Sequence, residues 1–131
     1  MNKQIFPKSL SRYLVVQAIF NQAFGFDKKE VEYNFIKNCD LTFHIDSDYE
    51  LSKEKFDKVF FKRIFNNVFK NEDIIGKLIS QNLNESWQFT RLPKILQAIL
   101  KVAISEMITY PKTSIGIIAT EYLRLAESFN I

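Results

Sequence analysis

The chain has 131 residues, of which 47% are hydrophobic and 25% charged, so its composition is that of a folded globular protein rather than a disordered segment. This length indicates one domain over residues 1–131, and the net charge of +3 is too small to require a polyanionic partner. The single cysteine excludes an internal disulfide and a cysteine-based zinc cluster, which fits the reducing cytoplasm, and no apolar run approaches the length of a membrane span.

Apolar residues recur at helical spacing along almost the whole chain, and turn formers are rare, with 3 glycines and 3 prolines. We expect Gly25 to follow the end of the first helix, Asp27 and Glu30 to form a capping box for the second, and Ser52 to cap the third. Residues 40–51 are the one expected long loop. The pattern therefore predicts an all-α bundle of about six helices, at residues 8–24, 28–38, 52–69, 71–83, 91–109 and 114–129.

The expected helix at 91–109 is apolar on most sides, which is typical of a helix in the middle of a bundle. Its one narrow polar stripe consists of Lys94, Gln97, Lys101 and Ser105. Glu106 falls beside the apolar surface, so its carboxylate needs a partner, such as a backbone N–H or a helix N-terminus. We therefore expect Glu106 to have a structural role and not a catalytic one.

Residues that carry chemistry are sparse. His44, Asp46 and Asp48 stand at alternate positions and could ligate a metal, and Cys39 with His44 could form a nucleophile pair, but both patterns are weak. The glycines are isolated, so no glycine-rich phosphate loop is present. We expect a binding module and not an enzyme, with no metal and no cofactor.

Three stretches, in the right order from about residue 8 to 129, resemble the NusB family of transcription antitermination factors. Residues 12–20 are similar to the family's opening helix, Arg-x-x-Ala-x-Gln-Ala-Leu-Tyr. Residues 87–107, WQFTRLPKILQAILKVAISEM, resemble its central signature: a Trp, an Arg-Leu, then Ala-Ile-Leu-Arg-x-Ala before Glu-Leu. Residues 111–129 resemble the next helix, where Ala-Ile-Asn-Glu leads to Glu-Leu-Ala-Lys-x-Phe. The resemblance implies the all-α NusB-like fold.

The sequence departs from the family pattern in three places. Only Lys8 and Arg12 stand where the family has several arginines, and Thr120 takes the place of an Asn. The family continues past the position of Ile131 with a short loop and a last helix that opens on Phe-Val-Asn-Gly. Two alternatives follow: either this protein lacks that helix, or the sequence is shortened at its C-terminus.

The resemblance implies a cytoplasmic transcription antitermination factor. Family members bind boxA-type single-stranded RNA in ribosomal RNA leaders together with a small-subunit ribosomal protein, and the complex loads on the RNA polymerase elongation complex. Residues 1–26 carry three cations and no acid, which suits RNA phosphates. Lys62 and Lys101 match family arginines, and Arg63 is added for its charge alone. The expected RNA-binding residues are Lys3, Lys8, Arg12, Lys62, Arg63 and Lys101.

Two other functions remain open. NusB-like domains also occur as RNA-binding extensions of ribosomal RNA cytosine methyltransferases, and this chain would then be a fragment, since it has no room for a catalytic domain. A helical protein-interaction scaffold without an RNA role would explain the scarcity of arginines and the short C-terminus. For the antitermination function, we expect the isolated chain to bind RNA poorly until a protein partner joins it, because three cations give little affinity by themselves.

Overall fold

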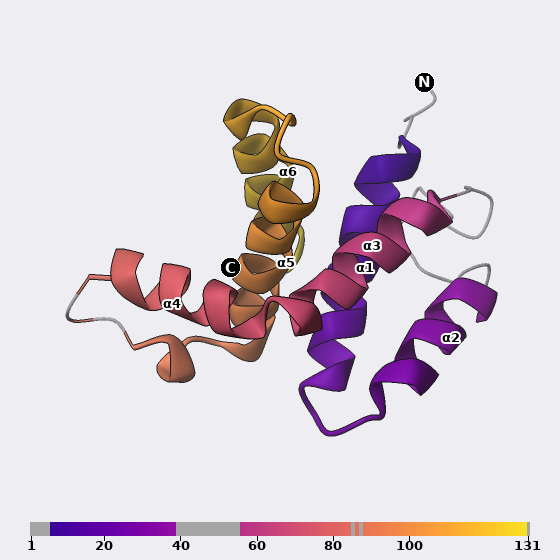
Figure 1. Cartoon of the computed structure of the whole chain (residues 1–131), viewed down its shortest axis with the longest axis horizontal. Helices are drawn as coiled ribbons and strands as arrows, with labels where there is room; N and C mark the ends of the chain where they lie inside the picture. Colours follow the sequence, from indigo (N-terminus) through magenta and orange to yellow (C-terminus); the bar gives the residue numbers. More distant parts are fainter. Residues whose placement is uncertain (1–5, 39–55, 85, 87, 131) are drawn as a thin grey trace.

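The computed structural model of the chain describes residues 6–38, 56–84, 86 and 88–130 (Figure 1). This part of the chain forms α-helices and one short 3₁₀ turn, and it contains no strand. The predicted all-α fold is confirmed. The elements are α1 (Pro7–Gln22), α2 (Lys28–Asn38), α3 (Lys58–Lys70), α4 (Glu72–Asn82), the 3₁₀ turn η2 (Phe89–Arg91), α5 (Lys94–Thr109) and α6 (Ile115–Ser128).

Local capping interactions fix the end of α1 and the start of α2. Gly25 follows α1 with a φ of +97°, which glycine adopts without steric cost, and its N–H donates to the carbonyl of Gln22. The Asp27 carboxylate accepts a hydrogen bond from the Glu30 N–H at 3.2 Å, so the predicted cap of α2 is confirmed.

The third helix begins at Lys58, so the predicted start at residue 52 was wrong. Its cap is Asp57, whose Oδ1 accepts a hydrogen bond from the Phe60 N–H at 3.0 Å, and not Ser52, which lies outside the described residues. The buried Ser11 of α1 fixes this cap, because its hydroxyl accepts from the Asp57 N–H and donates to the Asp57 carbonyl.

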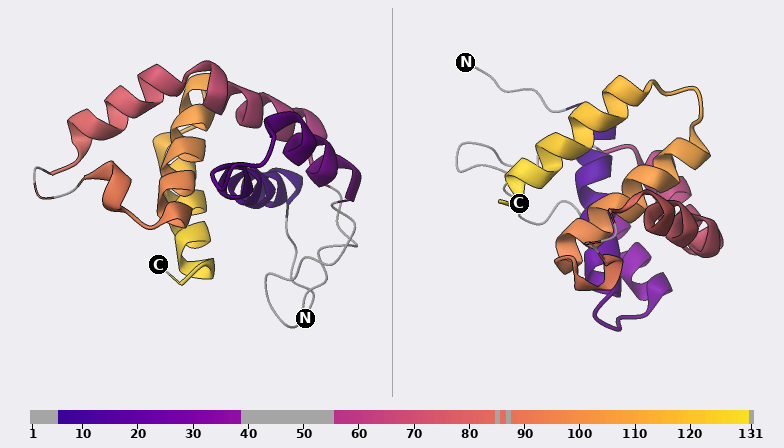
Figure 2. Two further views of the ribbon diagram at one scale, coloured as in Figure 1. Left: turned by 90° about the horizontal axis from the view of Figure 1, so that it is seen from below. Right: turned by 90° about the vertical axis from the view of Figure 1, so that its left-hand side faces the viewer.

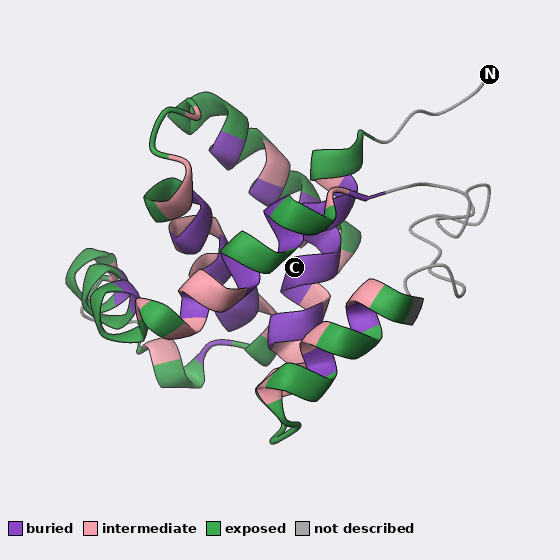
Figure 3. Ribbon diagram, turned by 45° about the vertical axis from the view of Figure 1, so that its right-hand side comes forward, coloured by how far each residue is buried: buried purple, intermediate pink, exposed green. Residues whose placement is uncertain are grey.

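Helix α5 lies at the centre of the bundle and packs against α1, α3, α4 and α6 (Figures 1 and 2). Figure 3 shows buried residues on the sides of the helices that face one another. Fully buried side chains of α3, among them Phe61 and Phe65, stack on each other and fill the space between α1 and α5. Helix α4 projects away from this core, and the chain then returns through η2 to the start of α5.

The polar stripe of α5 is divided between the core and the surface. Gln97 and Ser105 are buried, and their side chains donate to the backbone carbonyls of Leu92 and Ile64. Lys101 is partly exposed. Every buried side-chain nitrogen and oxygen in the described part of the chain has a hydrogen-bond partner, as native cores require. None of the described helices combines the length and the hydropathy that crossing a membrane would need.

Candidate nucleic-acid interface

Lys8 is the predicted cation that α1 presents to solvent. It lies in the first turn of the helix and is exposed, and its Nζ is 5.7 Å from the centroid of the Phe60 ring on α3. This cation–π contact holds the ammonium against α3 while leaving it open to solvent. Lys3, the other lysine predicted near this end, lies outside the described residues.

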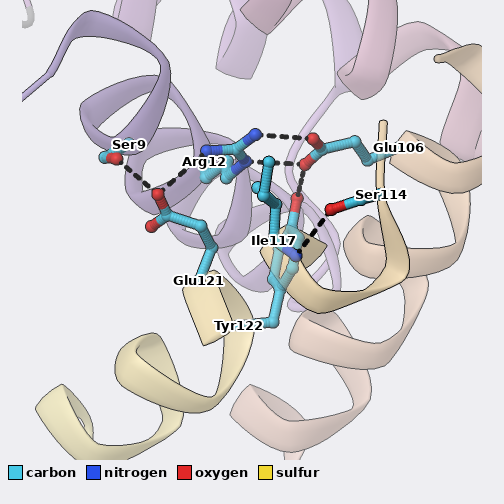
Figure 4. Close-up of polar contacts among 7 residues, drawn as sticks. All are labelled: Ser9, Arg12, Glu106, Ser114, Ile117, Glu121 and Tyr122. Carbon is cyan, nitrogen blue, oxygen red and sulfur yellow. Dashed lines mark hydrogen bonds and ion pairs between the residues drawn. The ribbon is translucent and has the colours of Figure 1, made fainter. Parts of the chain in front are cut away.

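Arg12, one turn further along α1, extends into the bundle and is only 5% exposed (Figure 4). Its Nε donates to Oε1 of Glu106 at 2.8 Å, and its Nη2 donates to Oε2 of the same carboxylate at 2.7 Å. The guanidinium also lies 5.2 Å from the centroid of the Phe60 ring. Two parallel charge-assisted bonds and an aromatic face therefore enclose this side chain.

Helix α6 supplies further groups to this ion pair (Figure 4). The Tyr122 hydroxyl donates to Oε1 of Glu106 at 2.6 Å, and Oε1 of Glu121 lies 3.2 Å from Nη1 of Arg12. Ser9 donates to that same Glu121 oxygen at 2.8 Å. The ion pair thus ties α1, α5 and α6 together.

The environment shifts the pKa of two groups in this network. Burial lowers the pKa of Arg12, but the hydrogen bonds and negative charge of Glu106 outweigh it, so the pKa is raised overall. Burial raises the pKa of Tyr122 well above its ordinary value, and the adjacent Glu106 carboxylate raises it further. The guanidinium therefore stays charged and the phenol stays protonated, which is the state that their hydrogen bonds require.

This geometry bears on two of the sequence predictions. Arg12 is not an available RNA contact, because its guanidinium is buried and already bound by two carboxylates, so a phosphate would have to displace Glu106. Glu106 has the structural role that was predicted, but its partners are a guanidinium and a phenol rather than a backbone N–H or a helix N-terminus.

Lys62 and Arg63 are both exposed on α3, but they face different neighbours. Arg63 lies between Phe60, which stacks on Tyr110 at the end of α5, and Asn67, which donates to Thr109. Residues three apart lie on the same side of a helix, so Arg63 follows Phe60, the ring that Lys8 contacts, by one turn of α3. Lys62, the residue before Arg63, lies about 100° away from it around the axis of α3. The residue one turn after it, Asn66, donates to Glu32 of α2, so Lys62 lies on the α2 side.

Lys101 is separate from these cations. It lies eight residues before Thr109 on α5, which corresponds to about 12 Å along the helix axis. Its Nζ is 5.7 Å from the centroid of the Phe89 ring in η2. Lys101 also lines a cavity of about 360 Å³ whose walls come from α1, α3, α4, η2 and α5. The structure therefore leaves Lys8, Lys62 and Arg63 exposed and places Lys101 beside a cavity that the sequence did not predict.

The metal and nucleophile patterns fall on residues outside the described part of the chain, namely Cys39, His44, Asp46 and Asp48. Among the residues that the structure does describe, no group of three histidine, cysteine or acidic side chains is placed to hold a metal ion. The described site thus comprises the internal Arg12–Glu106 ion pair and, apart from it, exposed cations on α1 and α3.

The fold and this site define an all-α bundle protein in which a buried ion pair joins three helices. The NusB family model matches residues 9–131, and the chain belongs to the NusB family.

Three relatives, each named transcription antitermination protein NusB, show how much of the chain is shared. The protein of Bartonella quintana is 28% identical over 97 residues, which cover 74% of this chain and 56% of the relative. That of Hyphomonas neptunium is 36% identical over 76 residues, or 58% of this chain and 49% of the relative. That of Bartonella tribocorum is 26% identical over 135 residues, which cover 95% of this chain and 81% of the relative. The chain thus spans only about half the length of several curated relatives that it matches.

Proposed function

We propose that this chain is a cytoplasmic transcription antitermination factor that acts by binding and catalyses no reaction. Its RNA ligand is boxA-type single-stranded RNA of ribosomal RNA leaders, and its partners are a small-subunit ribosomal protein and the RNA polymerase elongation complex. The observation that carries the proposal is membership of the NusB family over residues 9–131, in a family whose relatives bear the antitermination name.

The arrangement of Lys8 and Arg63 supports an RNA role. Both side chains are exposed, Lys8 against the Phe60 ring and Arg63 one turn after Phe60 on α3, and no carboxylate within the described residues forms an ion pair with either. Exposed cations without carboxylate partners suit the phosphates of an unpaired strand, because a single strand can adjust its backbone to them.

Two such cations give only weak affinity, so a protein partner is needed to complete the site. Helix α6 offers large apolar side chains for that purpose, with Ile115 70% exposed and Leu123 66% exposed. Exposed apolar groups of this size are typical of surfaces that contact another protein. We therefore expect RNA binding to depend on the ribosomal protein.

A filter-binding assay with a boxA-like RNA, with and without the small-subunit ribosomal protein, tests this function. We expect little RNA retention by the chain alone and clear, sequence-selective retention when both proteins are present. A scrambled RNA of the same length and composition is the control, because it keeps the phosphates and changes only the order of bases. Equal retention of both RNAs would contradict the proposal.

The exposed apolar side chains of α6 and the burial of Arg12 also favour a second candidate, a helical protein-interaction scaffold without an RNA role. The same assay separates the two functions. A scaffold would bind the ribosomal protein in a pull-down, and the complex would retain no more boxA-like RNA than the ribosomal protein does by itself.

A further inference from the structure

The cavity of about 360 Å³ beside Lys101 has apolar walls from four parts of the chain. Buried side chains of α1, α3 and α4 form its interior, including Ile19, Val68 and Ile75. The ring of Phe89 in η2, which is partly exposed, forms another wall. Its volume lies within the range of roughly 300–1,000 Å³ that is typical of sites for small organic groups.

Three polar side chains stand around these walls, namely Gln22, Glu72 and Lys101. Within the described residues, neither the amide of Gln22 nor the carboxylate of Glu72 takes part in a hydrogen bond or an ion pair. Among the described residues, the polar or ring contact of Lys101 is with the Phe89 ring, at 5.7 Å from its centroid. An amide, a carboxylate and an ammonium together can donate to and accept from the edge of a flat heterocycle.

We propose that this cavity takes one unpaired nucleobase of the bound RNA, stacked on Phe89, with Gln22 and Glu72 facing its polar edge and Lys101 at the adjoining phosphate. This inference rests on the RNA-binding function proposed above. Proteins that read single-stranded RNA commonly hold a splayed base against an aromatic ring and bond to its exposed edge.

The composition of the cavity favours a base over a phosphate. The positive charge of Lys101 is offset by the negative charge of Glu72, so the cavity as a whole does not attract an anion. Six of its ten lining residues have apolar side chains, and a phosphate placed among them would lose its hydration without enough donors to replace it. A neutral base buries its faces against such walls and keeps its hydrogen bonds at the rim.

Gly76 on α4 makes the proposal testable without removing any polar group. It lines the cavity, and a Cβ built on it meets no atom within 4 Å. Gly76→Leu would therefore place a side chain in the cavity at little cost to folding. Gly76→Ala is the matched variant, because it makes the same change in backbone freedom and leaves most of the volume open.

The experiment measures binding of a boxA-like RNA in the presence of the small-subunit ribosomal protein, with the wild type, Gly76→Ala and Gly76→Leu. Each RNA nucleotide is replaced in turn by an abasic one. For the wild type and Gly76→Ala, we expect one abasic position to weaken binding about 10- to 100-fold, the size of one lost stacking contact. Gly76→Leu should bind the intact RNA more weakly by a similar factor and lose its sensitivity at that one position.

Two further variants guard against other causes. Phe89→Leu removes the aromatic face and should abolish the same abasic effect, so the test does not depend on Gly76→Leu alone. Gln81→Leu adds an apolar side chain at an exposed position of α4 that does not line the cavity, and it should leave binding unchanged.

The outcomes separate the two proposals. If wild type and Gly76→Leu bind equally and show the same abasic profile, the cavity holds no base, while the RNA-binding function stands. If Gly76→Leu and Phe89→Leu bind weakly but keep the abasic profile, the base proposal is also overturned. If the wild type with the ribosomal protein binds no RNA, both proposals fail together.

Discussion

Arg12 on α1 and Glu106 on α5 are joined by two parallel hydrogen bonds of 2.8 and 2.7 Å across the centre of the bundle. Both side chains are almost completely buried, and Tyr122 of α6 donates to the same carboxylate. A charge with this degree of burial is tolerated only because its partners replace the lost water. Arg12 of α1 thus joins three helices and does not lie on the surface.

Replacing Arg12 should strongly destabilise the protein. Arg12→Leu leaves the Glu106 carboxylate buried with the Tyr122 hydroxyl but without its cation, and loss of one partner of a buried ion pair costs about 3–5 kcal/mol. Urea unfolding followed by circular dichroism measures this change as a fall in the midpoint. Lys8→Ala is the matched control, since Lys8 is exposed and its loss should change stability by less than about 0.5 kcal/mol.

Removing the Tyr122 hydroxyl should have a smaller effect. Tyr122→Phe keeps the ring in place and deletes one donor to Glu106, while both hydrogen bonds from Arg12 remain. Hydrogen bonds to a charged group contribute about 1.5–3 kcal/mol, and we expect a loss of that size at neutral pH. Tyr33→Phe serves as the control because Tyr33 is 59% exposed. Equal midpoints for Tyr122→Phe and the wild type would show that the hydroxyl adds nothing.

The same hydroxyl should make stability depend on pH in the alkaline range. The pKa of Tyr122 is raised in the folded protein above its ordinary value of 10.0, because burial and Glu106 both oppose the phenolate. Its contribution is therefore fully present below pH 10, the pKa in the unfolded chain, and is lost as the pH rises toward the folded value. Urea midpoints measured from neutral pH to above pH 10 should show the wild type and Tyr122→Phe converging. A constant difference would contradict this.

The cap at Asp57 should be measurable by a conservative pair of variants. Asp57→Ala removes the acceptor for the Phe60 N–H and should destabilise the protein by about 0.5–2 kcal/mol. Asp57→Asn keeps an acceptor in the same place and should stay close to the wild type, since asparagine is an equally good cap. If both variants lose the same stability in thermal unfolding, the negative charge and not the cap is responsible.

The helical fold could be predicted because apolar periodicity is a local signal that each segment carries by itself. Asp27 was recognised as a cap for the same reason, and its carboxylate accepts the expected N–H of Glu30. The start of α3 was misplaced because Ser52 and Asp57 are both good capping residues. What selects Asp57 is its contact with Ser11, which lies 46 positions away and leaves no mark in the local pattern.

The candidate site was harder to predict, because a sequence shows which residues are charged but not which of them face one another. Arg12 and Glu106 are 94 positions apart, and only the packing of α1 on α5 makes them a pair. The position of Glu106 beside an apolar helix surface was a usable signal, since a carboxylate there needs a buried partner. The cavity beside Lys101 gave no such signal, because its walls come from five separate elements.

The salt dependence of RNA binding tests most directly whether the surface around Lys8 and Arg63 meets the phosphates. The measurement is the slope of log affinity against log salt concentration, for a boxA-like RNA and the ribosomal protein together. For Lys8→Ala/Arg63→Ala we predict a slope shallower by about 1.4, or 0.7 for each lost phosphate contact. Lys29→Ala/Lys37→Ala, which removes two exposed lysines of α2, should leave the slope unchanged. An unchanged slope for Lys8→Ala/Arg63→Ala would show that RNA does not bind at this surface.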